Sequence, residues 1–365
     1  MSTTEEKVLV RVEGRLGRLT LNRPRAINAL DHDMVTALRE ALTAWEHDDA
    51  VAAVLIDGAG ERGLCAGGDI RAISASARER DGAAAAFWRD EYLLNEHISR
   101  YPKPYIAFMD GVVMGGGVGV SAHGSVRVVT ERSNVGMPET TIGFVPDVGG
   151  TYLLSRAPGE AGTHLALTAG SVGAGDAIAL GLADHYVPAE RLSDLAAALT
   201  EATGAGDVAE AVGRFAETAP APTLTGERWI DACYSAATAE EIVDRLRGHG
   251  DPAAAAAADT VLAKSPTAVK VALAALRRAR ELPGLAAVLE QEYRVSCAAL
   301  DSPDFVEGVR AQIIDKDRNP KWVPDTLDGV TAEEVARHFR PAPDGPLGLA
   351  DLGTDTDSLT TGGAP

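Results

Sequence analysis

Two glycine-rich turns carry the groups in this sequence that are best suited to chemistry. Gly115-Gly116-Gly117 follows an apolar segment and opens a short apolar helix, and Ala66-Gly67-Gly68-Asp69 opens another helix earlier in the chain. Backbone N–H groups at helix starts are unpaired and carry partial positive charge. Glycine lets a ligand approach them closely. If the two turns converge, their N–H groups could hold a carbonyl oxygen that becomes negative during a reaction.

Two carboxylates follow these turns, and each comes directly after a proline. They are Glu139, in Pro138-Glu139, and Asp147, in Pro146-Asp147. A carboxylate beside an oxyanion site can attack a carbonyl carbon or activate a water molecule. A lone Glu or Asp is usually a solvated surface residue. The functional interpretation therefore depends on the glycine turns and both acids occurring together.

Other patterns in the chain do not support a competing chemistry. Gly58-Ala59-Gly60-Glu61-Arg62-Gly63 matches GxGxxG, but more loop follows it where a dinucleotide-binding fold needs a helix. The segment from Gly119 to His123 resembles a nucleophile elbow, but His123 stands where glycine is required. We therefore predict that Ser121 and His123 are packing residues of a short helix. The eight histidines form no HxxxH or HExxH pattern, so no metal site is expected.

The elements that must position these groups alternate between strand and helix as far as Val187. A hairpin is predicted over residues 8–21, a helix that begins at Asp31, and buried strands over Ala52–Ile56 and Pro104–Met109. This alternation predicts an α/β fold. Beyond Pro188 almost every segment has helical periodicity. We expect an α/β core with the active site over residues 1–203, a helical C-terminal region over 204–340, and a disordered tail over 341–365, which is rich in Pro, Gly, Asp and Thr.

Composition limits the partners and the compartment. The 365 residues carry a net charge of −19, which disfavours nucleic acid and anionic membranes but not a small anionic ligand. The chain lacks about 18 consecutive apolar residues and begins with a polar segment, so neither a membrane span nor a secretory signal is expected. Three widely spaced cysteines suit a reducing cytoplasm. Abundant Ala and an excess of Arg over Lys suggest a bacterial source.

A series of motifs, taken in order, resembles the crotonase (enoyl-CoA hydratase/isomerase) superfamily from Val8 to Phe339. The matching segments are Leu21-Asn22-Arg23-Pro24, Asn28-Ala29-Leu30, Cys65-Ala66-Gly67-Gly68-Asp69-Ile70, Asp110-Gly111, Gly115-Gly116-Gly117, Pro138-Glu139 and Gly149-Gly150-Thr151. The resemblance implies a crotonase-like (ClpP/crotonase) α/β spiral of repeated ββα units, followed by a helical C-terminal region. It also implies an acyl-CoA thioester as the small-molecule substrate, with no cofactor beyond the CoA that the substrate carries, and a homo-oligomer, a trimer or a hexamer.

Gly119 separates the branches of this superfamily. Hydratases resemble this chain but carry a glutamate two residues after the three glycines, where this chain has Gly119. The hydrolase branch is similar in having an aspartate at the position of Asp147. The resemblance therefore implies hydrolysis of a short-chain acyl-CoA thioester, 3-hydroxyisobutyryl-CoA to 3-hydroxyisobutyrate and CoA, as in valine catabolism. Hydration or isomerisation of a short-chain enoyl-CoA is the alternative, and a non-catalytic acyl-CoA-binding protein is a third interpretation.

The resemblance also implies roles for individual residues. The thioester oxygen would lie between the N–H groups of Gly68 and Gly116. Glu139 would either attack the carbonyl, giving a mixed anhydride, or activate water. Asp147 would orient the acyl hydroxyl or the water. Glu91 matches a substrate-contacting position near the acyl end, and an exposed helix residue is the other interpretation.

The CoA moiety would contact three residues near the two turns. Ala66 matches a position in the family's first glycine turn. Arg23 and Arg25 lie where the family binds the CoA nucleotide, and they could meet its phosphates. Surface salt bridges are an equally good interpretation of the two arginines.

Overall fold

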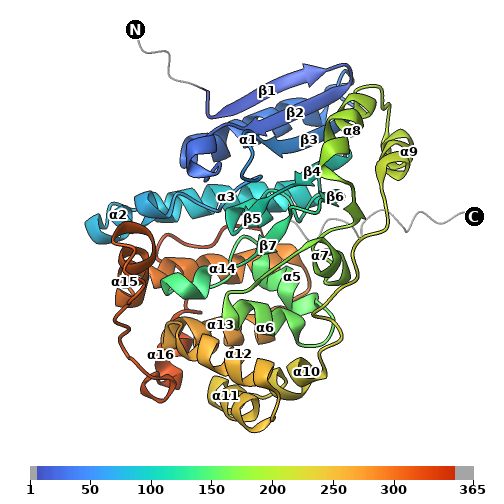
Figure 1. The fold of residues 1–365 in the computed structure, drawn as a ribbon. Coiled ribbons are helices and arrows are strands. Elements are labelled where there is room, and N and C mark those ends of the chain that lie inside the picture. Colours follow the sequence, from blue (N-terminus) through green and yellow to red (C-terminus); the bar gives the residue numbers. More distant parts are fainter. Residues whose placement is uncertain (1–5, 350–365) are drawn as a thin grey trace, which may run out of the picture.

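A six-stranded sheet forms the upper part of the protein in Figure 1, a computed structural model that describes residues 6–349. Its strand order is β1-β2-β3-β4-β6-β9. The strands are β1 (Val8–Glu13), β2 (Leu16–Leu21), β3 (Ala53–Gly58), β4 (Tyr105–Met109), β6 (Val126–Val129) and β9 (His185–Tyr186). Strands β1 and β2 form the predicted antiparallel hairpin, and the pairings from β2 to β9 are parallel. The α/β architecture expected from the sequence is confirmed.

Helices cover both faces of this sheet because successive strand residues point to opposite sides. Val54 and Ile56 of β3 belong to a cluster with α1 (His32–Glu46) and α3 (Ala83–Ser99), whereas Ala53 and Leu55 pack with α8 (Leu192–Leu199) and α9 (Ala205–Phe215). Helix α1 begins as predicted, because the side chain of Asp31 accepts the N–H of Met34 at 3.0 Å. Two short 3-10 helices, Pro24–Ala26 and Ala189–Arg191, lie before α1 and α8.

A second, three-stranded sheet connects the glycine turn to the first acid. It consists of β5 (Val112–Met114), β7 (Asn134–Gly136) and β8 (Ser171–Val172). Gly115 and Pro138 follow β5 and β7, and the N–H of Gly115 donates to the carbonyl of Gly136 at 3.3 Å. Strands of two or three residues carry too little periodicity to be predicted from sequence. Their pairing nevertheless brings Gly116 and Glu139 to the same end of the sheet.

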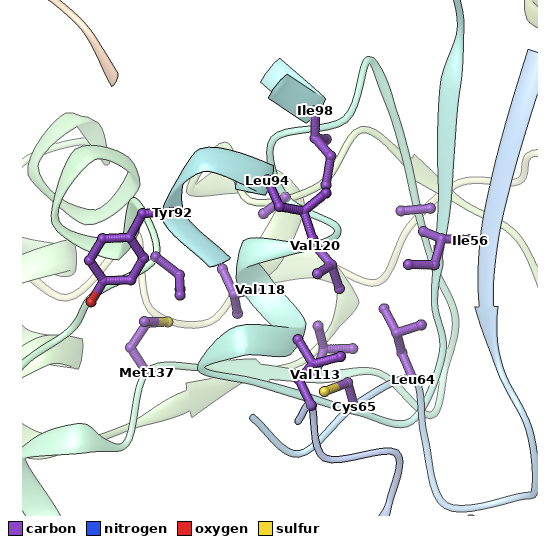
Figure 2. Close-up of a cluster of buried hydrophobic side chains, with 14 of the residues drawn as sticks. Ile56, Leu64, Cys65, Tyr92, Leu94, Ile98, Val113, Val118, Val120 and Met137 are labelled. Atoms are coloured by element: carbon purple, nitrogen blue, oxygen red, sulfur yellow. The ribbon is translucent and has the colours of Figure 1, made fainter. Parts of the chain in front are cut away.

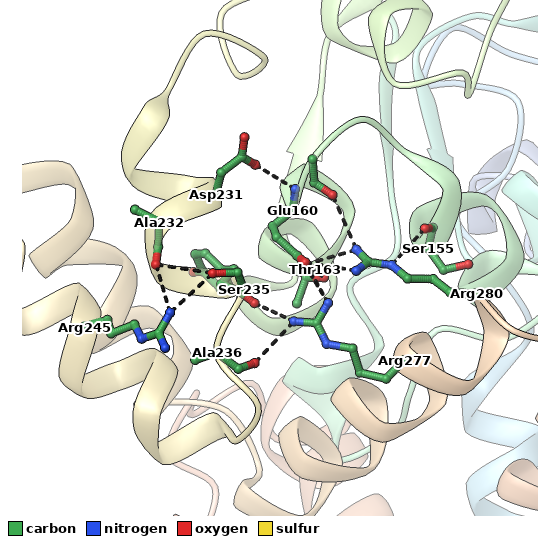
Figure 3. Close-up of polar contacts among 12 residues, drawn as sticks. Ser155, Glu160, Thr163, Asp231, Ala232, Ser235, Ala236, Arg245, Arg277 and Arg280 are labelled. Carbon is green, nitrogen blue, oxygen red and sulfur yellow. Dashed lines mark hydrogen bonds and ion pairs between the residues drawn. The ribbon is translucent and has the colours of Figure 1, made fainter.

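Helices dominate the lower half of the molecule in Figure 1. The remaining helices are α2 (Ile70–Glu79), α4 (Gly116–Gly119), a 3-10 helix (Glu139–Ile142), α5 (Gly150–Arg156), α6 (Ala161–Thr168), α7 (Ala174–Ala179), α10 (Arg228–Tyr234), α11 (Ala239–Gly248), α12 (Pro252–Leu262), α13 (Pro266–Ala279), α14 (Leu285–Ala299), α15 (Pro303–Val309), a π-helical turn (Arg310–Ile314), a 3-10 turn (Leu327–Gly329) and α16 (Ala332–Arg337). Helices α10 to α13 share their own hydrophobic cluster. Glu160, just before α6, pairs with Arg277 of α13 and with Arg280 (Figure 3). Helix α14 packs directly on α3, so the C-terminal region reaches the core sheet layers.

Packing differs from the expected domain division at two places. Helix α9, which the sequence assigns to the C-terminal region after residue 203, packs against the sheet, because Val208, Ala211 and Val212 fill the cluster under α8. The tail predicted as disordered from residue 341 is ordered as far as Leu349. Leu347 and Leu349 are buried, and their N–H groups donate to the buried carboxylate of Glu290. Two isolated leucines in a polar segment give no sequence periodicity. Residues 350–365 of the predicted tail lie outside the described part of the chain.

Candidate active site

The two glycine turns lie against each other. The N–H of Cys65 donates to the carbonyl of Val112 at 3.1 Å, and the carbonyl of Cys65 accepts the N–H of Met114 at 3.0 Å. A side chain on Gly67, whose φ is +113°, would lie 3.9 Å from the nitrogen of Gly116. Within residues 6–349, neither Gly68 nor Gly116 has a hydrogen-bond acceptor for its N–H. The structure therefore brings together the two donors that the sequence suggested as an oxyanion site.

Apolar packing fixes this pair of turns. Figure 2 shows Cys65 and Val113 beside Val118 and Val120 of the following helical turn, in one cluster with Ile56 of β3 and Leu94 of α3. All six side chains are buried. Because a close-packed core resists small displacements, the N–H groups are held in place before a ligand arrives.

The predicted acids line one cavity with these turns. The cavity has a volume of about 320 Å³ and includes Gly68, Gly116, Glu91, Glu139 and Asp147 in its wall. Its other walls are mostly apolar, formed by side chains that include Ile70, Ile73, Phe87, Trp88, Ile142, Phe144 and Ile313. A small apolar cavity with a few convergent polar groups is typical of a site for a small acyl group.

Each glutamate lies directly over a glycine of the second turn. A side chain on Gly115 would approach Oε1 of Glu139 to 2.8 Å, and one on Gly116 would approach Oε1 of Glu91 to 2.6 Å. Glu91 is only 2% exposed, so the interpretation of this residue as an exposed helix position is wrong. Neither Oε2 of Glu139 nor Oε1 of Glu91 has a hydrogen-bond partner among the described residues. Both carboxyl groups are therefore available to a ligand in the cavity.

Four carboxyl groups share this buried region, and their burial favours the protonated forms. Burial raises the pKa of Asp147 to about 7, and a hydrogen bond from Tyr92 opposes this rise. Burial followed by the charge of Asp147 raises the pKa of both Glu139 and Glu91 well above the usual range. Burial raises the pKa of Glu292, on α14, to about 8 against the hydrogen bonds that it accepts. Groups that titrate near neutral pH are suited to proton transfer under physiological conditions.

The loop that carries Asp147 is held by a distant glutamate, Glu292. Val148 has a φ of +51°, which is rare for a β-branched residue and persists only where the surroundings require it. Glu292 accepts the N–H groups of Gly149 and Thr151 at 2.6 and 2.9 Å, and the Thr151 hydroxyl at 2.5 Å. These contacts join positions about 140 residues apart. Glu292 lies in the segment Glu292-Tyr293-Arg294, which also resembles the family, but the segment by itself does not indicate this contact.

His123 also contacts this loop. Its Nε2 lies 2.8 Å from the carbonyl of Val148, and burial lowers its pKa to about 4. The ring is therefore neutral and donates its Nε2–H to that carbonyl, since a carbonyl can only accept. Ser121 is buried, as predicted for a packing residue, and its hydroxyl donates to the carbonyl of Gly117. His123 thus does more than pack, because it fixes the backbone next to Asp147.

Gly119 has no room for the glutamate that hydratases carry there. A Cβ on Gly119 would lie 2.7 Å from Cβ of Val148 and 2.9 Å from Nδ2 of Asn95. Real Cβ atoms essentially never approach other atoms this closely. A larger residue at this position must displace its neighbours, and one of them, Val148, directly follows Asp147. The absence of a glutamate at position 119 is therefore linked to the conformation of the loop that carries Asp147.

The three predicted CoA contacts differ in their surroundings. Ala66 is exposed at the cavity. Arg25 is exposed, and within the described residues no ion pair involves it. Arg23 bonds to the carboxylate of Asp69 at 3.0 Å and to the carbonyl of Ala29 at 2.6 Å, which matches the salt-bridge interpretation.

Across residues 6–349, no cluster of three or more His, Cys, Asp or Glu is arranged to bind a metal ion. No helix in that range is long and apolar enough to cross a membrane.

Known proteins are similar to this chain over most of its length. The profile of the family described as enoyl-CoA hydratase/isomerase matches residues 16–339. The chain is 40% identical to the mitochondrial 3-hydroxyisobutyryl-CoA hydrolase of Danio rerio, over 93% of this chain and 90% of that protein. It is 39% identical to the human enzyme of the same name, over 95% and 90%.

Two solved structures are similar over nearly their whole length. One is named a carnitinyl-CoA dehydratase from Mycobacterium thermoresistibile, with a TM-score of 0.89 and 54% identity over 93% of this chain and 98% of that one. The other is named an enoyl-CoA hydratase from Rhodobacter sphaeroides 2.4.1, with a TM-score of 0.84 and 41% identity over 94% and 99%.

Proposed function

This chain belongs to the enoyl-CoA hydratase/isomerase (crotonase) family, and we propose that it hydrolyses 3-hydroxyisobutyryl-CoA to 3-hydroxyisobutyrate and CoA. The observation that carries the proposal is the arrangement of acids around the second glycine turn. Glu139 and Asp147 line the cavity, whereas Gly119 leaves the hydratase position without a carboxylate. Curated relatives about 40% identical over most of the chain carry the name of this hydrolase.

The geometry suggests how the thioester would react. Its carbonyl oxygen would accept the N–H groups of Gly68 and Gly116, which have no acceptor within the described chain. Glu139 would react in its ionised form, since only the carboxylate can attack the carbonyl or take a proton from water, and its Oε2 is buried and unpaired among the described residues. In one route a Glu139 oxygen bonds to the carbonyl carbon, the C–S bond breaks, and water cleaves the resulting anhydride. In the other route Glu139 takes a proton from water as that water attacks. Both routes end in a carboxylic acid and free thiol.

The acids in the cavity wall support a hydroxylated acyl group. Glu91 and Asp147 line the cavity together with mostly apolar side chains, and a neutral carboxylic acid can both donate and accept a hydrogen bond. The cavity volume of about 320 Å³ suits a short branched chain rather than a long one. Ala66 and Arg25 are the positions for CoA contacts that remain open to solvent.

Dehydration or hydration of an acyl-CoA is the second candidate. The 54% identical structure named a carnitinyl-CoA dehydratase favours it. A reaction of that kind adds or removes water across a carbon–carbon bond and releases no thiol. The steric conflict at Gly119 counts against the usual two-glutamate arrangement in this chain.

The deciding experiment measures free thiol from purified protein with 3-hydroxyisobutyryl-CoA, 3-hydroxypropionyl-CoA, carnitinyl-CoA and a short enoyl-CoA. Thiol release from the hydroxyacyl esters is expected, and a change in enoyl absorbance without thiol would establish the second candidate instead.

Glu139→Gln should reduce thiol release at least about 100-fold while substrate still binds. Glu96→Gln is the matched control, since Glu96 is equally buried but pairs with Arg100 outside the cavity. An active Glu139→Gln variant would overturn the assignment.

Heavy-oxygen water tests for the anhydride route of Glu139. After a single turnover, label in the Glu139 carboxylate requires an anhydride whose glutamyl carbon was attacked by water. Label confined to the product is expected for direct attack of water on the thioester and equally for an anhydride attacked at its acyl carbon. Mass spectrometry of the peptide that contains Glu139 distinguishes these outcomes.

The oligomeric state and the cellular location of the protein are also part of the proposal. A trimer or hexamer is expected from the family resemblance, and light scattering of the full chain would measure it. A cytoplasmic location is consistent with the three cysteines being free thiols in the structure.

A further inference from the structure

We propose that Tyr92, supported by Ser296, is a positioning residue that holds Asp147 in a single orientation throughout the reaction. The inference depends on the hydrolase function proposed above and names a part of the same site. Tyr92 lies on α3 and Ser296 on α14, and both side chains are fully buried. The Tyr92 hydroxyl oxygen lies 2.7 Å from Oδ2 of Asp147 and 2.7 Å from Oγ of Ser296.

A count of protons gives this chain of hydrogen bonds a direction. A phenol has one proton to donate. When Oδ2 of Asp147 is ionised, Tyr92 donates to it, so the Ser296 hydroxyl must donate to the oxygen of Tyr92. When Asp147 takes up a proton on Oδ2, the same three oxygens can reverse: Asp147 donates to Tyr92, and Tyr92 donates to Ser296. The carboxyl group can therefore change its protonation state without losing its partner or moving.

The surroundings make this hydrogen bond important. The titratable groups around Asp147 are Glu91 and Tyr92 from α3, Glu139 from its 3-10 helix (Glu139–Ile142), and Glu292 from α14. No Lys or Arg among the described residues forms an ion pair with these carboxyl groups. Within the same residues, Tyr92 is the side chain that donates to Asp147. Burial and neighbouring charges raise the pKa of Tyr92 well above 10, so the phenol keeps its proton at physiological pH.

The ring of Tyr92 is fixed independently of its hydroxyl. It packs edge-on against Tyr293, with ring centroids 6.3 Å apart and an angle of 84° between the planes. Figure 2 shows Tyr92 at the edge of the apolar cluster, with its hydroxyl directed away from the labelled aliphatic side chains. A buried hydroxyl aimed from a rigid ring positions its acceptor more firmly than a mobile surface donor would. Helix α14 thus contributes to the site through Ser296 and Tyr293, although neither lines the cavity.

The test compares Tyr92→Phe with Tyr101→Phe. The control also loses one buried hydrogen bond, from the Tyr101 hydroxyl to the carbonyl of Leu42, at a place away from the cavity. Tyr92→Phe should lower kcat for thiol release about 10- to 100-fold, the effect of losing a hydrogen bond to a charged group, with KM nearly unchanged. It should also move the acid limb of the pH–kcat profile to higher pH, because the carboxylate loses its donor. Ser296→Ala should also shift the acid limb of the pH–kcat profile to higher pH, but by less than Tyr92→Phe does.

Several outcomes separate this inference from a merely structural role and from the proposed function. Equal losses of kcat in Tyr92→Phe and Tyr101→Phe, with an unshifted profile in both, would overturn it. If Tyr92→Phe does not fold, Ser296→Ala decides, and a wild-type profile in that variant counts against the proposal. If the wild type releases no thiol, the hydrolase assignment fails by itself. A carbon-13 carboxyl titration, with Asp147→Asn to assign the signal, would then still show whether Tyr92→Phe raises the pKa of Asp147.

Discussion

Replacing Gly119 with alanine tests why this chain lacks the glutamate found in hydratases. The new methyl group would lie 2.7 Å from Cβ of Val148 and 2.9 Å from Nδ2 of Asn95. Both neighbours are buried, so one of them must move. Overpacking a close-packed interior costs about 1–3 kcal/mol. With an m-value of roughly 3 kcal/mol/M for a chain of this size, the urea midpoint should fall by roughly 0.3–1 M.

The same substitution should reduce activity, because Val148 directly follows Asp147. Any shift of the strained Val148 backbone changes the direction of the Asp147 carboxyl group. Gly213→Ala is the matched control: Gly213 lies on the exposed side of α9, and a Cβ there meets nothing within 4 Å. That control should gain about 0.5–1 kcal/mol, since alanine loses less backbone freedom on folding than glycine.

A double-mutant cycle with Val148→Gly isolates the contact. Glycine at 148 removes the clashing Cβ and accepts the positive φ without strain. The cost of Gly119→Ala should therefore be at least about 1 kcal/mol smaller in the Val148→Gly background. Three results would refute the idea that Val148 excludes a glutamate from position 119. They are additive effects of the two substitutions, a wild-type urea midpoint for Gly119→Ala, and an enoyl-CoA hydratase activity gained by Gly119→Glu.

Two further predictions concern the glycine turn and the buried acids. Gly116→Ala would place a Cβ 2.6 Å from Oε1 of Glu91, so thiol release should fall on the order of 100-fold, while calorimetry detects nearly unchanged binding of CoA. The pKa of Asp147 is raised to about 7 and that of Glu292 to about 8. At these two groups the folded protein keeps protons that the unfolded chain has lost, so their contribution to the free energy of unfolding should be fully present near pH 4 and lost as the pH rises toward 8. Urea titrations across this range should show that Asp147→Asn removes part of this loss relative to the wild type, and an unchanged pH dependence in the variant would contradict the raised pKa of Asp147.

Much of the reactive constellation could be predicted from the sequence alone. Glycines that open helices and acids that follow prolines are local patterns, and the structure places Gly68, Gly116, Glu139 and Asp147 around one cavity. Glu91 lines the same cavity but was expected only from the family resemblance. Alternating hydrophobic periods likewise predicted the hairpin, the buried strands and the long helices. Local patterns were less informative where elements are very short, as in the three-stranded sheet. They also failed for the segment before Leu349, whose two buried leucines stand alone in a polar context.

The surroundings of the acids could not be predicted in this way. Tyr92 reaches Asp147 across 55 residues and Ser296 across 204. His123, which looked like a failed nucleophile motif, instead donates to the backbone beside Asp147. Arg23, a candidate for phosphate binding, is held by Asp69.

The sequence by itself determined which chemical groups this protein has and which short segments present them, because capping, turn formation and hydrophobic periodicity act over a few residues. Only the tertiary structure decided what those groups face. Helix α14 packs on α3 and thereby brings Glu292 to the loop of Asp147 and Ser296 to Tyr92. The protonation of the four acids and the space at Gly119 depend on such distant contacts, since burial and close packing are properties of the assembled core rather than of any one segment.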